Sequence, residues 1–200
     1  RARELESRKT YQLYLGEYEG TIGQQSFLNA VQNYPSLKGQ QTNLFKCFFP
    51  QGWLFARDKG VTAFVHPKSV FDDPLGSPLR KEMYQYLRYH FHFLNKEQLF
   101  LDVSTSREFG LSVFVNQKKY GFDLIGNLVS VETIDSCYEE TSSKDVPNMF
   151  DDNGKWNHKG HPERIIHIGE KELKVMGTVY GTQDWKGTCL LILHLNVLLK

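Results

Sequence analysis

The chain has 200 residues, which suits one domain or a domain with an appendage. Its 40% hydrophobic and 14% aromatic content is enough for a packed core. The 24 basic and 23 acidic residues nearly cancel, which excludes an argument for nucleic-acid binding from net charge, so any DNA contact must come from local patches.

Cysteine usage and hydropathy bear on the compartment. The three cysteines are Cys47, Cys137 and Cys189, an odd number without metal-like spacing, which favours a reduced cytoplasmic compartment. The apolar run 189–199 is too short and too interrupted to span a bilayer, and nothing resembles a signal peptide. We therefore expect a cytoplasmic protein with no membrane partner.

The first quarter of the chain predicts helices. Residues 1–18 are charged and helix-prone, which indicates an exposed lead-in helix, and a short second helix is predicted near residues 27–31. Residues 44–55 carry apolar side chains on most faces, which predicts a buried helix with a bend at Pro50.

The central stretch 61–115 has an alternating α/β pattern. Residues 61–65 are β-branched and aromatic, which predicts a strand buried on both faces. Ser77 stands where an N-cap is expected, with Pro78 at the first position of an amphipathic helix to about Tyr89. Apolar segments 91–94 and 99–101 then flank a polar break, and after a turn residues 111–115 form a strand, so a hairpin closes this part of the sheet.

The last third is less regular. Residues 124–131 predict a strand, 131–138 a short helix, and 139–160 an irregular surface loop. A strand over 164–168 and a helix over 170–180 follow. The run 189–199 is either a helix or a strand, because periodicity alone does not separate the two.

Several unusual peptides occur in one order along the chain. They are residues 32–48, His66-Pro67 with 71–74 and 79–80, 92–95 with 99–100, and 153–156 with 160–162 and 164–165. Together they resemble DNA adenine-N6 methyltransferases of large bacterial restriction-modification (type IIG-like) and phage-defence enzymes. The resemblance spans residues 27–168, most of the chain.

The resemblance also has departures. Such enzymes, like other class I (Rossmann-like) methyltransferases that use S-adenosylmethionine, need a glycine-rich cofactor loop and an Asn-Pro-Pro-aromatic tetrapeptide, and the chain has neither. The implied fold is α/β: the later strands and helices of a methyltransferase sheet with an appended irregular α+β region. The implied division is a helical lead-in (1–26), the C-terminal half of a catalytic domain (27–117) and a target-recognition or connector region (118–200).

The implied function is that of a fragment of a site-specific DNA adenine-N6 methyltransferase, which contributes the adenine pocket and DNA contacts but is inactive alone. S-adenosylmethionine would bind the full-length enzyme, and the expected partners are double-stranded DNA and the rest of the polypeptide. Removal of upstream strands would expose the edge of strand 61–65, which predicts self-association or cover by the N-terminal segment. The competing interpretation is a non-catalytic DNA-binding or protein-interaction module of a defence complex.

Two groups of residues are candidates for the site. The resemblance places Phe100 where an aromatic ring stacks on an extruded base, and enzymes that act on a base in duplex DNA need such a face. It implies a substrate pocket made by Asn43, Leu44, Phe45, His66, Pro67 and Phe100. Cations around one tryptophan predict phosphate contacts and stacking by Lys155, Trp156, His158, Lys159, His161 and Arg164.

Simpler interpretations stand beside these. Phe100 can be a core residue of a buried strand, His66 a structural strand terminator, and Trp156 the buried anchor of a solvated loop. His90 and His92 suggest a metal pair, but no third ligand has suitable spacing. The acidic residues of loop 72–73 suggest a nuclease, but the lysine that such a site needs does not follow Asp102. We expect no catalytic residue and no metal in this chain.

Overall fold

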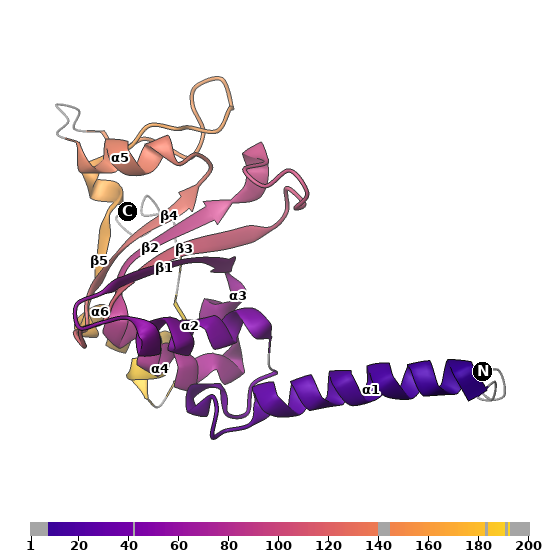
Figure 1. Ribbon diagram of the computed structural model, residues 1–200. Coiled ribbons are helices and arrows are strands. Elements are labelled where there is room, and N and C mark those ends of the chain that lie inside the picture. Colours follow the sequence, from indigo (N-terminus) through magenta and orange to yellow (C-terminus); the bar gives the residue numbers. More distant parts are fainter. Residues whose placement is uncertain (1–7, 42, 140–144, 183, 191, 193–200) are drawn as a thin grey trace.

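The computed structural model describes residues 8–41, 43–139, 145–182, 184–190 and 192, and within them one mixed sheet has five strands. The strands are β1 (Val61–Pro67), β2 (Leu87–Leu94), β3 (Glu108–Val115), β4 (Phe122–Leu128) and β5 (Ile166–Ile168). Their order is β1-β3-β2-β4-β5 (Figure 1). β1 and β2 both pair antiparallel with β3, and β4 is parallel to β2, so β1, β2 and β4 share one direction. The predicted α/β class is confirmed at this level.

Helices cover both faces of the sheet unequally. One face carries α2 (Leu44–Phe55), α3 (Ser69–Asp72), α4 (Ser77–Tyr86) and α6 (Glu170–Val179), and the other carries α5 (Glu132–Tyr138), while α1 (Arg8–Asn29) projects away from the body (Figure 1). The larger core lies on the first face and includes Phe49, Leu79, Met83, Phe114 and Leu173. The smaller core, on the α5 side, is made by Phe91, Phe93, Ile125, Leu128 and Cys137.

Strand β1 differs from its prediction. It lies at the edge of the sheet, and Val61 and Val65 are 65% and 56% exposed, so the expectation of burial on both faces is wrong. Alternate residues such as His66 point into the helix-side core, while the opposite face of β1 has no helix over it. One face of β1 is therefore covered and the other is not. An apolar composition alone does not distinguish such a strand from one that is buried on both faces.

The helix predicted for residues 78–89 starts and ends earlier. α4 begins at Ser77 with Gly76 as its N-cap, so Ser77 is the first helical residue and not the cap. The helix ends at Tyr86, and His90 belongs to β2, which pairs with β3 on one side and β4 on the other. Pairing with two neighbours outweighs the helical spacing of these residues.

The N-terminal helices also differ from their prediction. The lead-in and the expected second helix form one continuous helix, α1, which spans both. α2 has the predicted bounds and contains Pro50, but Leu44, Phe48 and Phe55 are exposed, so it is buried on one side only.

Downstream predictions of element type are confirmed. β4, α5, β5 and α6 lie where a strand, a short helix, a strand and a helix were expected. The boundary proposed at residue 117 falls inside the sheet, because β4 and β5 extend the same sheet as β1 to β3. Most of run 189–199 lies outside the described residues. Short 3-10 turns connect the elements: Pro35–Leu37, Pro74–Gly76, Asn95–Glu97, Pro162–Arg164 and Trp185–Gly187.

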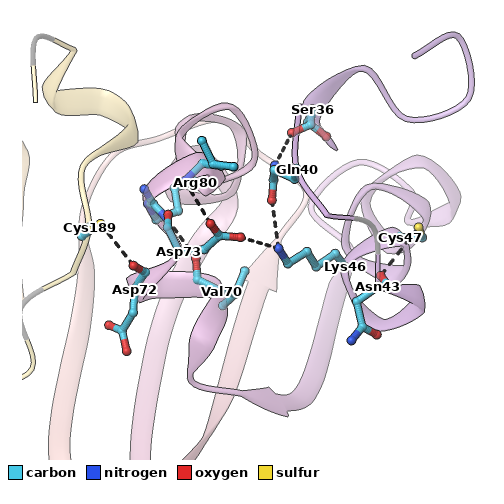
Figure 2. A network of polar contacts seen from close by, with 11 residues as sticks. Ser36, Gln40, Asn43, Lys46, Cys47, Val70, Asp72, Asp73, Arg80 and Cys189 are labelled. Atoms are coloured by element: carbon cyan, nitrogen blue, oxygen red, sulfur yellow. Dashed lines mark hydrogen bonds and ion pairs between the residues drawn. The ribbon is translucent and has the colours of Figure 1, made fainter. Parts of the chain in front are cut away.

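A polar network ties distant segments together on the helix side (Figure 2). The Arg80 guanidinium, 1% exposed, donates to the carbonyl oxygens of Val70 (3.2 Å), Asp73 (2.6 Å), Gly187 (3.1 Å) and Thr188 (2.9 Å). These four oxygens come from segments more than a hundred residues apart in the chain. The buried charge therefore joins the C-terminal segment to the start of α4.

The same network reaches α2. Lys46 Nζ is 2.6 Å from Asp73 Oδ2 and donates to Gln40 Oε1 at 3.2 Å. Burial raises the pKa of Asp73, but hydrogen bonds from Lys46 and the Leu75 amide outweigh burial and leave that pKa below its ordinary value. The acid pair once suggestive of a nuclease thus has one member fixed in a structural ion pair.

The three cysteines are free thiols. None of the helices in the described part of the chain is long and apolar enough to cross a membrane.

Candidate functional site

An open pocket of about 460 Å³ lies at the edge of the sheet where β1 ends and β3 begins. In open α/β sheets, ligands bind beyond the carboxyl ends of the parallel strands, and β1 and β2 both end at this edge. The pocket walls are mainly apolar, with three polar residues among them. The lining residues are Val65, His66, Pro67, Phe100, Val103, Arg107, Glu108 and Phe109. The volume falls in the range of small-molecule sites.

Three of the six predicted pocket residues meet here: His66, Pro67 and Phe100. Phe100 lies in the loop between β2 and β3, is 43% exposed, and packs edge to face on Phe109 with ring centroids 4.9 Å apart. The interpretation of Phe100 as a core residue of a buried strand is therefore wrong. Part of the ring contacts Phe109 and the rest is exposed at the pocket.

The loop that presents Phe100 is built around a single buried amide. Asn95 is fully buried; its Nδ2 donates to the carbonyl oxygens of Phe100 (3.1 Å) and Val103 (2.8 Å), and its Oδ1 accepts from the Phe100 amide (3.0 Å). Gln98 takes a left-handed conformation that turns the chain back toward the pocket. Asn95 thus fixes both backbone polar groups of Phe100. The sequence marked it as part of a polar break and of one resembling peptide, not as the anchor of this loop.

Glu108, at the start of β3, is also at the pocket, and its carboxylate is held by two groups. Its Oε2 accepts from Lys68 Nζ at 2.8 Å and from His92 Nε2 at 3.0 Å. His92 Nδ1 accepts from the Asn127 amide at 3.2 Å, which places the ring proton on Nε2 and makes that nitrogen a donor. Burial raises the pKa of Glu108, but the hydrogen bonds from Lys68 and His92 outweigh it, and the pKa lies below its ordinary value. Glu108 is ionised at neutral pH.

A β-bulge supplies the amide that orients His92. Phe91 pairs with Ile125 and Phe93 pairs with Leu128, so β4 has one extra residue opposite His92. Asn127 adopts a positive φ of 55° at this point, which asparagine tolerates better than most residues. The distortion turns its N–H toward the imidazole. Backbone geometry on β4 therefore controls a pocket residue on β3 through His92.

His66 forms a wall of the pocket rather than a free base. Its Nδ1 donates to the Pro67 carbonyl (2.9 Å), so its Nε2 accepts from the Ser112 hydroxyl (2.8 Å). Ser112 in turn accepts from His90 Nδ1 (2.9 Å). Burial lowers the pKa of His66 to about 4, against the effect of the Pro67 hydrogen bond. Both ring nitrogens of His66 are occupied and the ring is neutral near pH 7.

The same chain of hydrogen bonds ends on an unpaired atom. With its proton on Nδ1, His90 has an acceptor at Nε2, which has no hydrogen-bond partner among the described residues and is fully buried. Burial lowers the pKa of His90 well below its ordinary value, and the nearby His66 lowers it further. The ring centroids of His66 and His90 lie 6.0 Å apart. A Cβ atom added at Gly110 would come within 2.5 Å of His90 Cε1. Only glycine fits at that position of β3.

The other predicted pocket residues lie at the start of α2. Asn43 caps this helix by accepting from the Phe45 amide at 3.5 Å, Leu44 is half exposed, and Phe45 packs against the helix-side core. None of the three lines the pocket.

The predicted DNA-binding residues divide by exposure. Lys155, His158 and Lys159 are exposed, and Trp156 is half-buried. The Trp156 ring packs on Phe150 with centroids 4.5 Å apart, across a β-bridge between the two residues.

His161 and Arg164, from the same set, are buried. Arg164 Nη1 donates to the Lys159 carbonyl at 2.9 Å, and His161 Nδ1 accepts from the Glu163 amide at 3.1 Å. In this structure these two residues support the loop from inside, and the accessible cations are Lys155 and Lys159.

One contact joins this loop to the pocket loop. His158 Nε2 donates to Glu97 Oε1 at 2.8 Å, and the His158 carbonyl accepts from Thr133 Oγ1 at 2.8 Å. Glu97 lies in the turn that leads to Phe100. The segment with Lys155 and Lys159 is therefore tied to the loop that forms the pocket wall.

Among the described residues, no three or more His, Cys, Asp or Glu side chains are grouped so as to hold a metal ion. Asn43 to Phe45, from the predicted substrate pocket, serve a helix cap and core packing, and the pocket has mainly apolar walls. These described residues do not by themselves make a site for S-adenosylmethionine.

No protein-family model and no curated protein matches the chain. The crystal structure of the type IIG restriction endonuclease BpuSI is similar to part of it, with 15% identity and a TM-score of 0.35. That alignment covers 48% of this chain and 12% of that chain. A likeness of this size is too weak to support an argument about function.

Proposed function

We propose that this chain is the part of an S-adenosylmethionine-dependent DNA adenine-N6 methyltransferase that binds the extrahelical target adenine. The observation that supports it is the pocket at the end of β1, where a half-exposed Phe100 ring faces apolar side chains. A flipped base needs a flat apolar contact and a wall that excludes water. Val65, Pro67 and Phe109 supply that wall.

Surrounding charges fit an approach of duplex DNA from the loop side. Arg107 is exposed at the pocket, and Lys155 and Lys159 lie on the segment tied to the Phe100 loop through Glu97. Cations near the mouth can neutralise the phosphates that flank an extruded nucleotide. We propose double-stranded DNA as the partner, in the cytoplasm, as a component of a restriction-modification system.

Phe100 provides the direct test, using this chain and a labelled duplex with one unpaired adenine, for which little energy is needed to expose the base. Stacking of a base on an aromatic ring contributes about 1–3 kcal/mol, so Phe100→Ala should weaken binding by roughly one to two decades. Phe100→Trp should retain most of the affinity because a large ring remains. Fluorescence anisotropy measures both.

Stability serves as the control. Because Phe100 is 43% exposed, Phe100→Ala should cost only about 1 kcal/mol, mostly the edge-to-face contact with Phe109. A loss of about 3–5 kcal/mol in urea unfolding, with binding reduced only in proportion to the unfolded fraction, would contradict a stacking role.

The methyltransferase proposal and the non-catalytic alternative differ in whether the full-length protein requires a cofactor. We propose that S-adenosylmethionine binds the full-length enzyme, that the rest of that polypeptide completes the cofactor site, and that this chain alone does not methylate. Isothermal titration of the chain with S-adenosylmethionine should show no tight site. Micromolar one-to-one binding would contradict this. A full-length protein that binds DNA with no cofactor dependence would favour a non-catalytic DNA-binding module.

The open edge of β1 supports a further partner. The exposed Val61 and Val65 lie on an edge strand, and such edges associate with other strands. We propose that β1 pairs with the remainder of the polypeptide or with a second copy of the chain. A chain that sediments as a monomer at high micromolar concentration would exclude the second copy.

A further inference from the structure

The long helix α1 has little support from its own chain. Among the described residues it meets the body at its C-terminal end, where the Phe27 and Tyr34 ring centroids are 6.3 Å apart and Leu28 packs against the larger core. From there the helix extends away from the body (Figure 1). Three glycines lie inside α1, and glycine destabilises a helix relative to alanine. Because most helical stability in proteins comes from packing of an apolar face, α1 needs a surface to pack against.

One side of α1 has the residue spacing of a coiled-coil seam. Tyr11, Leu15, Tyr18 and Ile22 follow one another at intervals of four, three and four residues, which places them along one line of the helix. Tyr11, Tyr18 and Ile22 are exposed, and Leu15 is half-buried. Alternation of four and three keeps an apolar line facing a second helix over several turns. The spacing therefore identifies the kind of partner, which is one helix with an apolar seam of its own.

The charge pattern of α1 suits a second copy of the same helix. From Tyr11 to Asn29 the charged residues are Glu17 and Glu19, and Glu17 lies away from the seam. Charges that flank a seam set which helices pair, and here Glu19 is the one such charge in that range. Two copies therefore meet with little repulsion, and the flanks offer no cation to select an acidic partner.

We propose that two copies of this chain associate through α1, with the seam of Tyr11, Leu15, Tyr18 and Ile22 packed against the same seam of the other copy. An interface that uses the same patch on both copies closes by two-fold symmetry. Since α1 extends beyond the body, a second helix can reach the seam without meeting the sheet (Figure 1). The inference concerns assembly and depends neither on the pocket nor on DNA binding.

The size of the seam predicts a weak dimer. Each helix contributes four side chains, two of them tyrosines, and a tyrosine buries at most roughly 150–250 Å². The total is close to about 1,000 Å², the lower limit for a specific interface. We therefore expect dissociation in the micromolar range, so that the concentration of the chain decides whether it is paired.

The test compares two leucine-to-lysine variants of α1. Leu15 lies in the seam, whereas Leu13 is exposed on the opposite side of the same helix. The two substitutions change net charge and helix propensity equally, so Leu13→Lys is the matched control. Sedimentation velocity across the micromolar range should show the same monomer–dimer equilibrium for the wild type and Leu13→Lys. In Leu15→Lys the dimer should be weaker by at least about tenfold.

Hydrogen exchange locates the interface in the same samples. Amides of α1 should exchange more slowly as the wild-type concentration rises, and this slowing should be absent in Leu15→Lys. Because the seam lies outside the core, both variants should keep the wild-type thermal unfolding of the body.

Two results would overturn the inference. One is a wild-type chain that stays monomeric throughout the concentration series. The other is a dimer that Leu15→Lys leaves unchanged, with slower exchange in β1 in place of α1, which would assign the association to the open edge of the sheet. Neither result bears on the binding of a base by the pocket.

Discussion

Two polar clusters lie on the helix side of the same sheet and differ in the charge of their buried groups. One is built around the Arg80 guanidinium, which donates to four carbonyl oxygens, and around Lys46, which is bound by both Asp73 and Gln40. The other is built around the rings of His66 and His90, which are joined by the Ser112 hydroxyl and are neutral near pH 7 because burial lowers their pKa values. The first cluster is a structural joint. The second borders the pocket through His66, and the pocket is where we place function.

The largest expected effect lies in the Arg80 cluster. Arg80→Met removes a buried charged donor from four carbonyl groups. The Gly76 amide and the Tyr84 hydroxyl remain as donors to two of them, those of Asp73 and Thr188, and the change should cost about 3–5 kcal/mol of unfolding free energy. Urea unfolding measures the change. Lys81→Met is the control, since its ion pair with Asp184 is on the surface and should matter little. A loss below about 1 kcal/mol in Arg80→Met would remove the basis for calling this cluster a joint.

The second expected effect is a loss of stability at acidic pH, which should arise from the buried histidines and not from the Arg80 cluster. His66 has a folded pKa of about 4, below the ordinary 6.5, so the unfolded state binds more protons between these values. Stability is complete above pH 6.5 and falls as the pH drops toward 4, by about 3 kcal/mol from His66 alone. His90 and His92 are shifted in the same direction and add to the loss.

The Arg80 cluster should not contribute in that pH range. The pKa of Asp73 is lowered from 3.8, so its contribution is lost only at more acidic pH. Urea unfolding at pH 7, 5.5 and 4.5 should therefore show a steady fall in the wild type and a shallower one in His66→Gln. A flat profile from pH 7 to 4.5 would contradict the assignment of buried neutral histidines.

The sequence predicted part of the pocket but not the contacts that hold its residues in place. His66, Pro67 and Phe100 were predicted as pocket residues, and they do line one pocket. Glu108 and Asn95 were missed, because their roles depend on partners that are distant in sequence or buried by tertiary packing: Lys68 and His92 for Glu108, and the turn of its own loop for Asn95. The spacing of residues carries no signal for such contacts.

The errors in the fold have a related cause. Helical spacing extended α4 into β2, because a segment such as 87–90 satisfies both periods and only pairing with β3 and β4 decides between them. The strand at 61–65 was found, but its burial was misjudged because an apolar run does not reveal which neighbours are present.

The smallest of the three effects sharpens the comparison at the pocket loop. Asn95→Ala removes the amide that holds Phe100 and Val103, which should cost about 1–3 kcal/mol and weaken binding of the unpaired-adenine duplex. Hydrogen exchange of residues 96–104 should accelerate. Ser104→Ala, on the exposed side of the same loop, is the control. Unchanged exchange and unchanged binding in Asn95→Ala would mean that the loop is held by other contacts.

The most direct measurement of the central claim is the position of the base itself. In an NMR sample of the chain with a duplex that carries one unpaired adenine, we expect nuclear Overhauser effects from the adenine H2 and H8 protons to the ring protons of Phe100 and the methyl groups of Val65. Shifts confined to the amides of Lys155 to Lys159, with no contact between the adenine and Phe100, would place the DNA elsewhere and contradict the account.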